Sequence, residues 1–259
     1  MPRIAITRPV STSIVHCELT HLARESINYA RAVKQHEAYE AALAALGCEV
    51  TAAAAAPDMP DAVFVEDMAV VLDEVAVMAR PGVVSRRGEL DGVEEILARH
   101  RHVERINAPA TLDGGDVLRV GRRLFVGRSS RTNDEGISQL RTLVAKHGYD
   151  VDAMDVRGCL HLKSAVTAVG AKTLLGNGAW VDRQAFGDLE WIEVDPLEPH
   201  AANALWVGKG VIYPGAYTGT AARLRAHVDD QGMSIHLVDV SELAKAEGGV
   251  TCCSLLLTV

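Results

Sequence analysis

Short hydrophobic runs occur in pairs along the chain, and a polar or glycine-containing turn separates the two runs of each pair. The clearest pair covers 117–120 and 124–126, with a Gly-Arg-Arg turn between them, which is typical of two strands joined by a tight turn. A helical pattern over 135–146 follows and ends at Gly148, a residue type that accepts the left-handed conformation found after helix ends. An alternating run at 149–152 completes a predicted unit of strand, strand, helix and strand.

The same unit recurs at intervals of about 40 to 50 residues, and such self-similarity is the sequence signature of a repeat architecture. New units start near residues 61, 113, 161 and 203. The other predicted elements are strands over 61–71, 75–79, 103–106, 164–169, 173–175, 204–207, 211–213 and 235–238, and helices over 93–99 and 221–228.

The two ends of the chain supply the pieces of one further unit. The run from 250 onward predicts one strand, 4–6 predicts another, 25–45 an amphipathic helix and 49–53 a closing strand. We interpret these pieces as a fifth unit that is split between the termini. A circular array would place the last strand beside the first and remove long exposed sheet edges. The prediction is therefore an α/β fold in which residues 1–259 form a single domain.

The amino-acid composition and net charge limit the kinds of molecule that this protein is expected to bind. With 259 residues and 48% hydrophobic content, the chain is long enough for a substantial core. A net charge of −8 argues against nucleic acid and anionic membranes as partners and is compatible with a small cationic substrate. No apolar run approaches the ~20 residues that span a bilayer, and the start lacks the apolar core of a signal peptide. Five cysteines without a CxxC pair predict a reducing, cytoplasmic setting.

Residue types that carry chemistry gather at the starts of the predicted units. Because equivalent positions of a radial array face the same axis, these side chains are expected to converge although they are far apart in the sequence. The residues concerned are Asp61, Glu66, Asp67, Asp113, Asp116, His161, Asn203 and Cys252. Each one alone has a structural reading, since cysteine is among the most buried residue types and His161 could be a hydrogen-bonded core histidine. Their joint placement favours a catalytic site.

A thiolate that attacks an electron-poor carbon, with a histidine that moves protons, is a familiar catalytic pair. Neighbouring carboxylates would oppose formation of a thiolate, so they make sense only if the substrate is a cation. A guanidinium is planar, always charged and matches carboxylates in geometry. The spacing contains no metal motif such as CxxC or HExxH, so neither a metal nor a cofactor is expected.

Two cysteines are adjacent at the start of the last predicted strand. If 252–256 is extended, Cys252 and Ser254 lie on one face, which suits a pocket, and Cys253 and Leu255 lie on the other, which suits packing. This pattern favours Cys252 as the reactive residue.

Nine motifs now make the sequence recognisable as a whole. They are QHEAY at 35–39, DAVFVED at 61–67, RPG at 80–82, SRR at 85–87, TLDGGD at 111–116, RTN at 131–133, HLKS at 161–164, AAN at 201–203 and TCCS at 251–254. In this order they resemble the dimethylarginine dimethylaminohydrolases, within the guanidino-group-modifying superfamily of five-bladed α/β propellers, the pentein fold. The resemblance extends over nearly the whole chain.

The resemblance implies hydrolysis of N-methylated arginines to citrulline and a methylamine through a covalent thiouronium on cysteine. It implies Cys252 as the nucleophile, His161 as the general acid and base, and Asp113 as the carboxylate that orients His161. The implied substrate contacts are Glu66 and Asp67 at the guanidinium, Arg86 and Arg131 at the α-carboxylate, and Asp61 with backbone oxygens near Leu19 and Ala246 at the α-amino group. A homodimer is possible.

Other functions remain open on the same fold. An arginine deiminase or an amidinotransferase would use a similar site, and a non-catalytic propeller, such as the ribosome anti-association factor, would use none. The deiminases carry an aspartate two positions after the histidine, where this sequence has Lys163. The non-catalytic reading predicts loss of the cysteine and histidine, and both are present here.

Overall fold

The computed structural model of the protein describes residues 3–259, and its strands form five three-stranded sheets. Every sheet has the same plan, in which the middle strand pairs antiparallel with one neighbour and parallel with the other. In chain order the sheets are β3 (Ala69–Val71), β4 (Val75–Met78) and β5 (His102–Arg105); β6 (Val117–Val120), β7 (Arg123–Arg128) and β8 (Asp150–Asp155); β9 (Val166–Ala168), β10 (Thr173–Gly176) and β11 (Glu190–Glu193); β12 (Leu205–Trp206), β13 (Gly210–Pro214) and β14 (Ser234–Val238); and β15 (Leu255–Thr258), β1 (Arg3–Thr7) and β2 (Cys48–Ala52).

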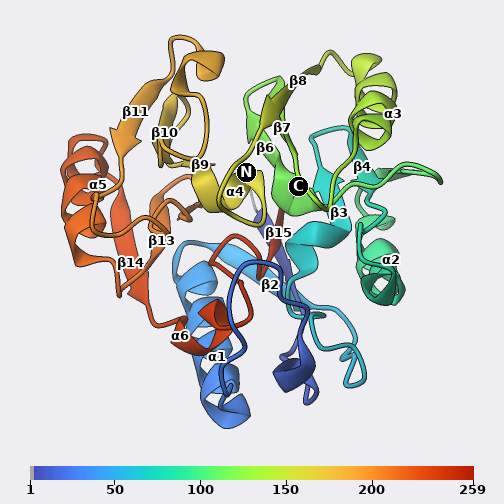
Figure 1. The fold of residues 1–259 in the computed structure, drawn as a ribbon, viewed down its shortest axis with the longest axis horizontal. Helices are drawn as coiled ribbons and strands as arrows, with labels where there is room; N and C mark the ends of the chain where they lie inside the picture. The colour runs from blue at the N-terminus through green and yellow to red at the C-terminus, as the bar shows by residue number, and fades with distance from the viewer. Residues whose placement is uncertain (1–2) are drawn as a thin grey trace.

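The last of these sheets joins the two ends of the chain. Strand β1 pairs antiparallel with β15, so that Arg3 lies opposite Thr258, and it pairs parallel with β2 on its other side. This pairing confirms the prediction that the ends of the chain share one unit. Figure 1 shows the five sheets around the middle of the molecule, with β15 near the centre and helices α1, α2, α3 and α5 at the periphery.

The middle strands are buried on both faces, and this explains why the sequence runs there are almost continuously apolar. In β7, for example, Leu124 and Val126 pack into one hydrophobic cluster and Phe125 packs into the next one. Five such clusters fill the spaces between neighbouring sheets. The sheet that contains both chain ends takes part in two of them, because Ile4 contacts one cluster and Ala5 the other.

A crossover segment connects each middle strand to its outer, parallel strand. Between β10 and β11 this segment contains a 3₁₀ turn at Arg183–Phe186, whereas the single helical turns α4 (Leu162–Ala165) and α6 (Ser241–Ala244) lie ahead of β9 and β15. In the other four sheets the crossover contains a longer helix: α1 (Tyr29–Ala45), α2 (Val93–Leu97), α3 (Asp134–Ala145) and α5 (Thr218–Asp230). Side chains cap two of them, since Asn28 accepts from the N–H of Arg31 and Asn133 accepts from the N–H of Gly136. Gly148 has φ 75°, so the predicted helix end is confirmed.

Three predicted strands start later than expected. Residues 61–64 form turns, a 3₁₀ helix covers Val65–Met68, and only Ala69–Val71 is a strand. Likewise α4 occupies the start of the strand predicted over 164–169, and the two cysteines lie in a turn ahead of β15. The reason is crowding at the middle of the molecule, where a Cβ on Gly114 would collide with the carbonyl oxygen of Glu66. Short helical turns let these backbones cross while their polar groups stay paired.

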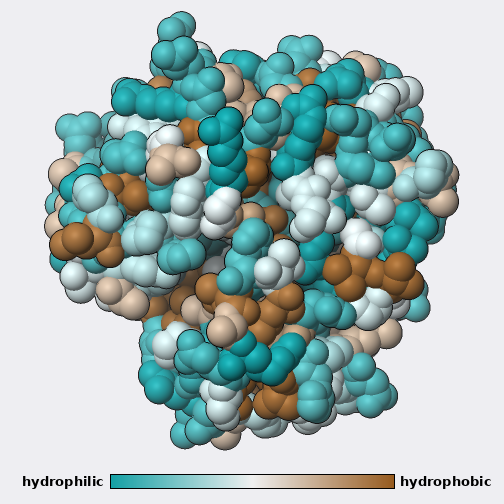
Figure 2. Space-filling model, viewed as in Figure 1, coloured by the Kyte–Doolittle hydropathy of each residue, from teal (hydrophilic) through white to brown (hydrophobic). Residues whose placement is uncertain are grey.

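Among residues 3–259, no helix combines the length and the hydrophobicity that crossing a membrane would require. Figure 2 shows hydrophilic and hydrophobic residues interspersed over the face seen in Figure 1, with hydrophobic ones gathered beside a hollow near its middle.

Candidate active site

Four segments that are far apart in the sequence bring polar side chains to the middle of the molecule. Glu66 and Asp67 belong to the 3₁₀ turn before β3, and Asp113 precedes the 3₁₀ turn Gly114–Asp116 before β6. His161 is the N-cap residue of α4, and Cys252 lies in the turn before β15. Equivalent places in successive units therefore converge, as the repeat predicted.

Two carboxylates hold the imidazole of His161. Its Nε2 lies 3.2 Å from Oδ2 of Asp113, whose Oδ1 accepts the N–H of Gly82 at 2.9 Å. Its Nδ1 lies 3.7 Å from Oδ1 of Asp67. Burial lowers the pKa of His161, but the carboxylates of Asp67, Asp116 and Asp113 outweigh burial and raise that pKa to about 9. The imidazole is therefore protonated at neutral pH.

The imidazole fits beside Asp67 only because residue 115 has no side chain. A Cβ on Gly115 would lie 2.5 Å from Nδ1 of His161 and 2.7 Å from Oδ1 of Asp67. The N–H of Gly115 instead donates to Oδ1 of Asp67 at 3.0 Å. The glycine pair of the GGD motif thus permits close approach of a backbone, a histidine and a carboxylate.

Asp67 also forms a buried ion pair with Arg86. Nη1 of Arg86 donates to Oδ2 of Asp67 at 2.6 Å, while its Nε and Nη2 donate to the carboxylate of Glu89. Burial raises the pKa of Asp67, but His161 and Arg86 outweigh burial and lower that pKa to about 2. Nη2 of Arg86 also contacts the carbonyl oxygens of Asp61 and Phe64. Of its five N–H hydrogens, one on Nη1 has no acceptor in the part of the chain that the structure describes.

Glu66 faces a different set of partners. Its Oε1 accepts from Nζ of Lys163 at 2.6 Å, and its Oε2 accepts from the hydroxyl of Thr251 at 2.9 Å. Asn203 holds the same threonine from the other side, because its amide nitrogen donates to Oγ1 of Thr251 and its oxygen accepts the N–H of Thr251. These contacts fix the residue that directly precedes Cys252.

The thiol of Cys252 accepts the N–H of Gly249 at 3.2 Å. Burial and the carboxylates of Glu66 and Asp67 raise the pKa of this thiol to about 12, although the Gly249 N–H and Lys163 act in the opposite direction. With no cation bound, the group is therefore a neutral thiol at neutral pH. A bound guanidinium would offset the two carboxylates and favour the thiolate.

The neighbouring side chains differ from the strand-based prediction. Cys253 is 1% exposed and its Sγ contacts the carbonyl oxygen of Gly249 at 3.5 Å. Ser254 does not face the Cys252 pocket, since it is buried and its hydroxyl lies 2.7 Å from that of Tyr39 in α1. Alternation fails because 251–253 is a turn, where successive side chains do not point to opposite faces. The prediction that Cys253 is the packed cysteine agrees with its burial.

A small hollow of about 20 Å³ brings seven of the ten predicted site residues together. They are Asp61, Asp67, Arg86, Arg131, His161, Ala246 and Cys252. Three predicted residues do not line it: Asp113 contacts the far edge of the imidazole, Glu66 is paired with Lys163, and Leu19 packs against the hydrophobic cluster around α1.

The loop at residues 18–22 lies beside this hollow, and three residues that line the hollow hold it through five hydrogen bonds. The carboxylate of Glu247 accepts the N–H groups of Thr20, His21 and Leu22. Arg131 donates to the hydroxyl of Thr20 at 2.9 Å, and Asp61 accepts the N–H of Glu18 at 3.1 Å.

Glu18 and Glu247 also line the hollow, although no motif in the sequence indicates them. Glu247 has φ 58°, an unusual conformation for a residue with a side chain. Neither residue stands at a repeated position, so the repeat pattern contains no signal that would have identified them.

One group of side chains could in principle hold a metal ion. Asp67, Asp113 and His161 offer ligand atoms that all lie within 4.8 Å of one another. Both carboxylates already accept backbone N–H groups, and Asp67 also pairs with Arg86. We therefore assign these side chains to hydrogen bonding, and independence from metal stays a prediction.

Comparisons with known proteins identify the family of the chain. A family model for eukaryotic N,N dimethylarginine dimethylhydrolase matches residues 16–176. The N(G),N(G)-dimethylarginine dimethylaminohydrolase of Streptomyces coelicolor is 40% identical over 254 residues, 98% of this chain and 96% of that protein. The enzyme of the same name from Pseudomonas aeruginosa is 37% identical over 238 residues, 91% of each chain.

Solved structures extend the likeness to three dimensions. The Pseudomonas aeruginosa DDAH, as a cysteine-to-serine mutant complexed with citrulline, superposes with a TM-score of 0.92 at 36% identity and covers 99% of this chain and 100% of that one. The N-terminal domain of ArgZ, a cyanobacterial arginine dihydrolase, has a TM-score of 0.86 at 19% identity, covers 99% of this chain and 98% of that one, and is alike in fold alone. The chain belongs to the dimethylarginine dimethylaminohydrolase family.

Proposed function

We propose that the protein hydrolyses N-omega-methylated arginines to citrulline and methylamine or dimethylamine. The observation that carries this proposal is that the thiol of Cys252 shares one hollow with a protonated imidazole and a buried carboxylate, those of His161 and Asp67. Membership of the family gives the reaction class. The structural relative that binds citrulline supports the product.

The proposed reaction begins when the substrate cation enters beside Asp67 and Glu66 and lowers the pKa of the Cys252 thiol, whose proton passes to water. The thiolate attacks the guanidinium carbon, and protonated His161 transfers its proton to the nitrogen that carries the methyl groups. The carbon–nitrogen bond breaks, the amine departs, and a thiouronium remains on Cys252. His161, now neutral, takes a proton from water, and the resulting hydroxide attacks the same carbon. The carbon–sulfur bond then breaks, citrulline leaves, and the hydroxyl proton of the intermediate restores the Cys252 thiol while His161 is again protonated.

The remaining predicted residues receive binding or positioning roles. Asp61, with carbonyl oxygens near Leu19 and Ala246, would hold the α-amino group, and the loop that donates to Asp61 would move as the substrate enters. Arg131 and the remaining Nη1 hydrogen of Arg86 would hold the α-carboxylate. Asp113 would keep the imidazole oriented through the 3.2 Å contact to Nε2. Glu66 would act through its charge and through Thr251, which precedes the nucleophile.

We further infer that the five sheets are the blades of a five-bladed propeller and that residues 1–259 act as one domain. The five hydrophobic clusters support this inference because each lies between two neighbouring sheets and together they close a ring. Free cysteines at all five positions are compatible with a cytoplasmic location. Location and a possible homodimer stay predictions.

Product analysis tests the activity. With asymmetric dimethylarginine, monomethylarginine and arginine side by side, we expect release of the methylated amines to exceed release of ammonia from arginine by at least about tenfold. The physical reason is that Lys163, paired with Glu66, replaces the second carboxylate that would grip an unsubstituted guanidinium. Ammonia release from arginine at an equal or higher rate would instead favour the deiminase alternative.

Exchange of Arg131 for lysine tests the binding roles. Lysine keeps the charge but loses the planar, forked geometry that matches a carboxylate. We expect KM for monomethylarginine to rise by about tenfold with a much smaller change in kcat, measured by steady-state kinetics. Arg128→Lys is the matched control, because Arg128 is an exposed arginine that pairs with Asp134 and Asp155 outside the hollow. An unchanged KM in Arg131→Lys would remove this residue from the binding site.

A further inference from the structure

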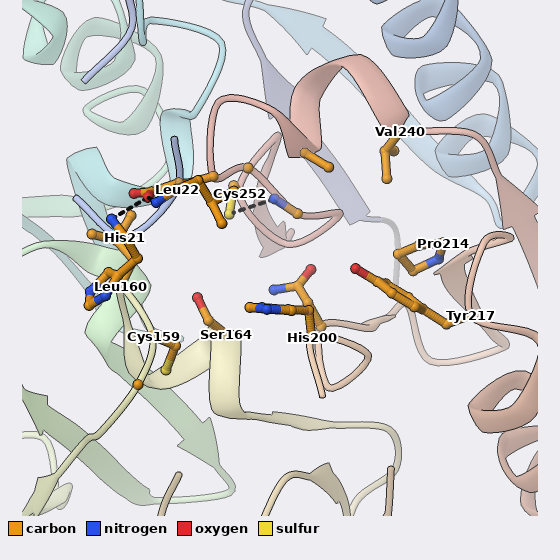
Figure 3. A pocket seen from close by; sticks show the side chains of 16 residues that line it. His21, Leu22, Cys159, Leu160, Ser164, His200, Pro214, Tyr217, Val240 and Cys252 are labelled. Atoms are coloured by element: carbon orange, nitrogen blue, oxygen red, sulfur yellow. Dashed lines mark hydrogen bonds between the residues drawn. The ribbon is translucent and has the colours of Figure 1, made fainter. Parts of the chain in front are cut away.

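A second and larger pocket opens beside the reactive cysteine. It has a volume of about 220 Å³ and shares Cys252, Leu160, Glu247 and Gly248 with the small hollow. Figure 3 shows Cys252 at its edge, with Ser164 and His200 across from it and Tyr217 at the far end. The thiol therefore stands where the two cavities meet.

The orientation in which an arginine derivative binds decides which of its groups can enter this pocket. The inference therefore rests on the proposed function. The groups proposed to hold the α-amino group and the α-carboxylate, such as Asp61 and Arg131, line only the small hollow. A substrate held there must bring its guanidinium carbon to Cys252. A substituent on the departing nitrogen, which lies beyond that carbon, then extends away from the small hollow and toward the larger pocket.

The walls of the pocket suit a hydrocarbon chain. Pro214, Tyr217, Val240 and Ala244 supply apolar surface from β13, the start of α5 and the region of α6. The imidazole of His200 closes one side and packs at 4.9 Å against the indole of Trp180. The proline and the aromatic rings are rigid, which suits a pocket that is largely pre-formed.

The size of the pocket exceeds the needs of one or two methyl groups. If each methyl or methylene group takes about 30 Å³, the share of one water molecule in the liquid, methyl groups use a small part of the 220 Å³. A chain of four carbons would use about half of it. We propose that this pocket is a subsite for the departing amine and that the protein hydrolyses N-omega-alkylated arginines whose substituent is a chain of three or more carbon atoms.

A chain-length series tests the proposal. For N-omega-methyl-, ethyl-, propyl- and butylarginine, the wild-type protein is expected to show a kcat/KM that rises by about two- to fourfold for each added methylene, because each buries additional apolar surface. The readouts are citrulline and the matching alkylamine, which must appear in equal amounts. A kcat/KM that falls from methyl to butyl would overturn the proposal.

A variant in which a larger side chain fills part of the pocket provides the matched comparison. Ala244 is half-buried on the pocket wall and is not part of the hydrophobic clusters, so Ala244→Leu adds volume inside the pocket rather than in the core. We expect this variant to keep methylarginine turnover within about threefold and to lose at least tenfold in kcat/KM for butylarginine. Ala98→Leu, at an exposed position after α2, is the control and should follow the wild type. If kcat/KM of Ala244→Leu changed with alkyl length in the same way as that of the wild type, the proposal would also be overturned.

Binding measurements separate this proposal from the proposed function. In Cys252→Ser protein, calorimetry should show affinity that increases with alkyl length, and Ala244→Leu should abolish that increase. If the wild type releases no amine from any compound, the proposed function fails while the affinity series still decides on the subsite. Flat or decreasing affinities would reject the subsite even if methylarginine is hydrolysed.

Discussion

Replacement of Cys252 by serine should reduce methylarginine turnover by on the order of 10⁴-fold or more, because a serine hydroxyl stays protonated where a thiol can ionise. The fold should be unaffected, since serine is nearly isosteric and can still accept the N–H of Gly249. Steady-state turnover and circular dichroism of the variant would check both expectations. A Cys252→Ser variant with more than a few per cent of wild-type activity would contradict the assignment.

Cys253→Ser is the matched control, because the two cysteines are adjacent and differ in surroundings. Cys253 is buried beside hydrophobic residues of the cluster around α1. A serine there should lower the free energy of unfolding by about 1 kcal/mol or more and leave most of the activity. Mass spectrometry of protein quenched during turnover should locate the covalent adduct on the peptide with Cys252 modified. An adduct on Cys253 would show that Cys253, and not Cys252, is the nucleophile.

His161→Asn should lower kcat by about 10²- to 10⁴-fold, the range by which a positioned acid and base accelerates proton transfer. Asparagine cannot donate a proton to the departing amine, so the loss should be smaller for a substrate whose leaving group needs no protonation, such as S-methylthiocitrulline. This comparison distinguishes an acid from a merely structural residue. Because both substrates give the same thiouronium, the comparison uses the rate of leaving-group release in the first turnover, and an equal loss of that rate for both substrates would contradict the acid role of His161.

The same variant should change how stability depends on pH. The pKa of His161 is raised from its ordinary 6.5 to about 9 in the folded protein. Its contribution to stability is therefore fully present below about pH 6.5 and is lost as pH rises through 9. The total is on the order of 3 kcal/mol. Denaturant unfolding from pH 6 to pH 8, below the range in which cysteine thiols ionise, should show the start of this decline for the wild type and a much smaller decline for His161→Asn.

The order of elements was predictable from the sequence because the middle strands are buried on both sides. Runs such as those of β4 and β13 are apolar at successive positions, and the strands and helices flanking them recur with one plan. The split unit was predictable for the same reason, since the leftover pieces at the two ends matched the missing parts. Helix ends followed local signals such as Gly148, whose φ of 75° favours glycine.

The details of the site depend on contacts that no local pattern encodes. The strand predicted over 61–71 begins eight residues late because Asp67 must reach both Arg86 and the N–H of Gly115, which a 3₁₀ turn allows. Glu89 completes the ion pairs of Arg86 but has no motif of its own. Glu247 holds the loop beside the site from a position that no repeat marks. The roles of these residues follow from contacts with residues that are distant in the sequence.

The sheet shared by the two ends has a consequence for the nascent chain on the ribosome. Among the described strands, β1 is synthesised first and its antiparallel partner β15 is synthesised last. One edge of β1 must therefore wait, unpaired or protected by a chaperone, while the other four sheets are synthesised. Cys252 lies three residues before Leu255, the first residue of β15. Cys252 and the strand that completes this sheet are therefore synthesised nearly together, and enzymatic activity in a translation reaction would report that this sheet is complete.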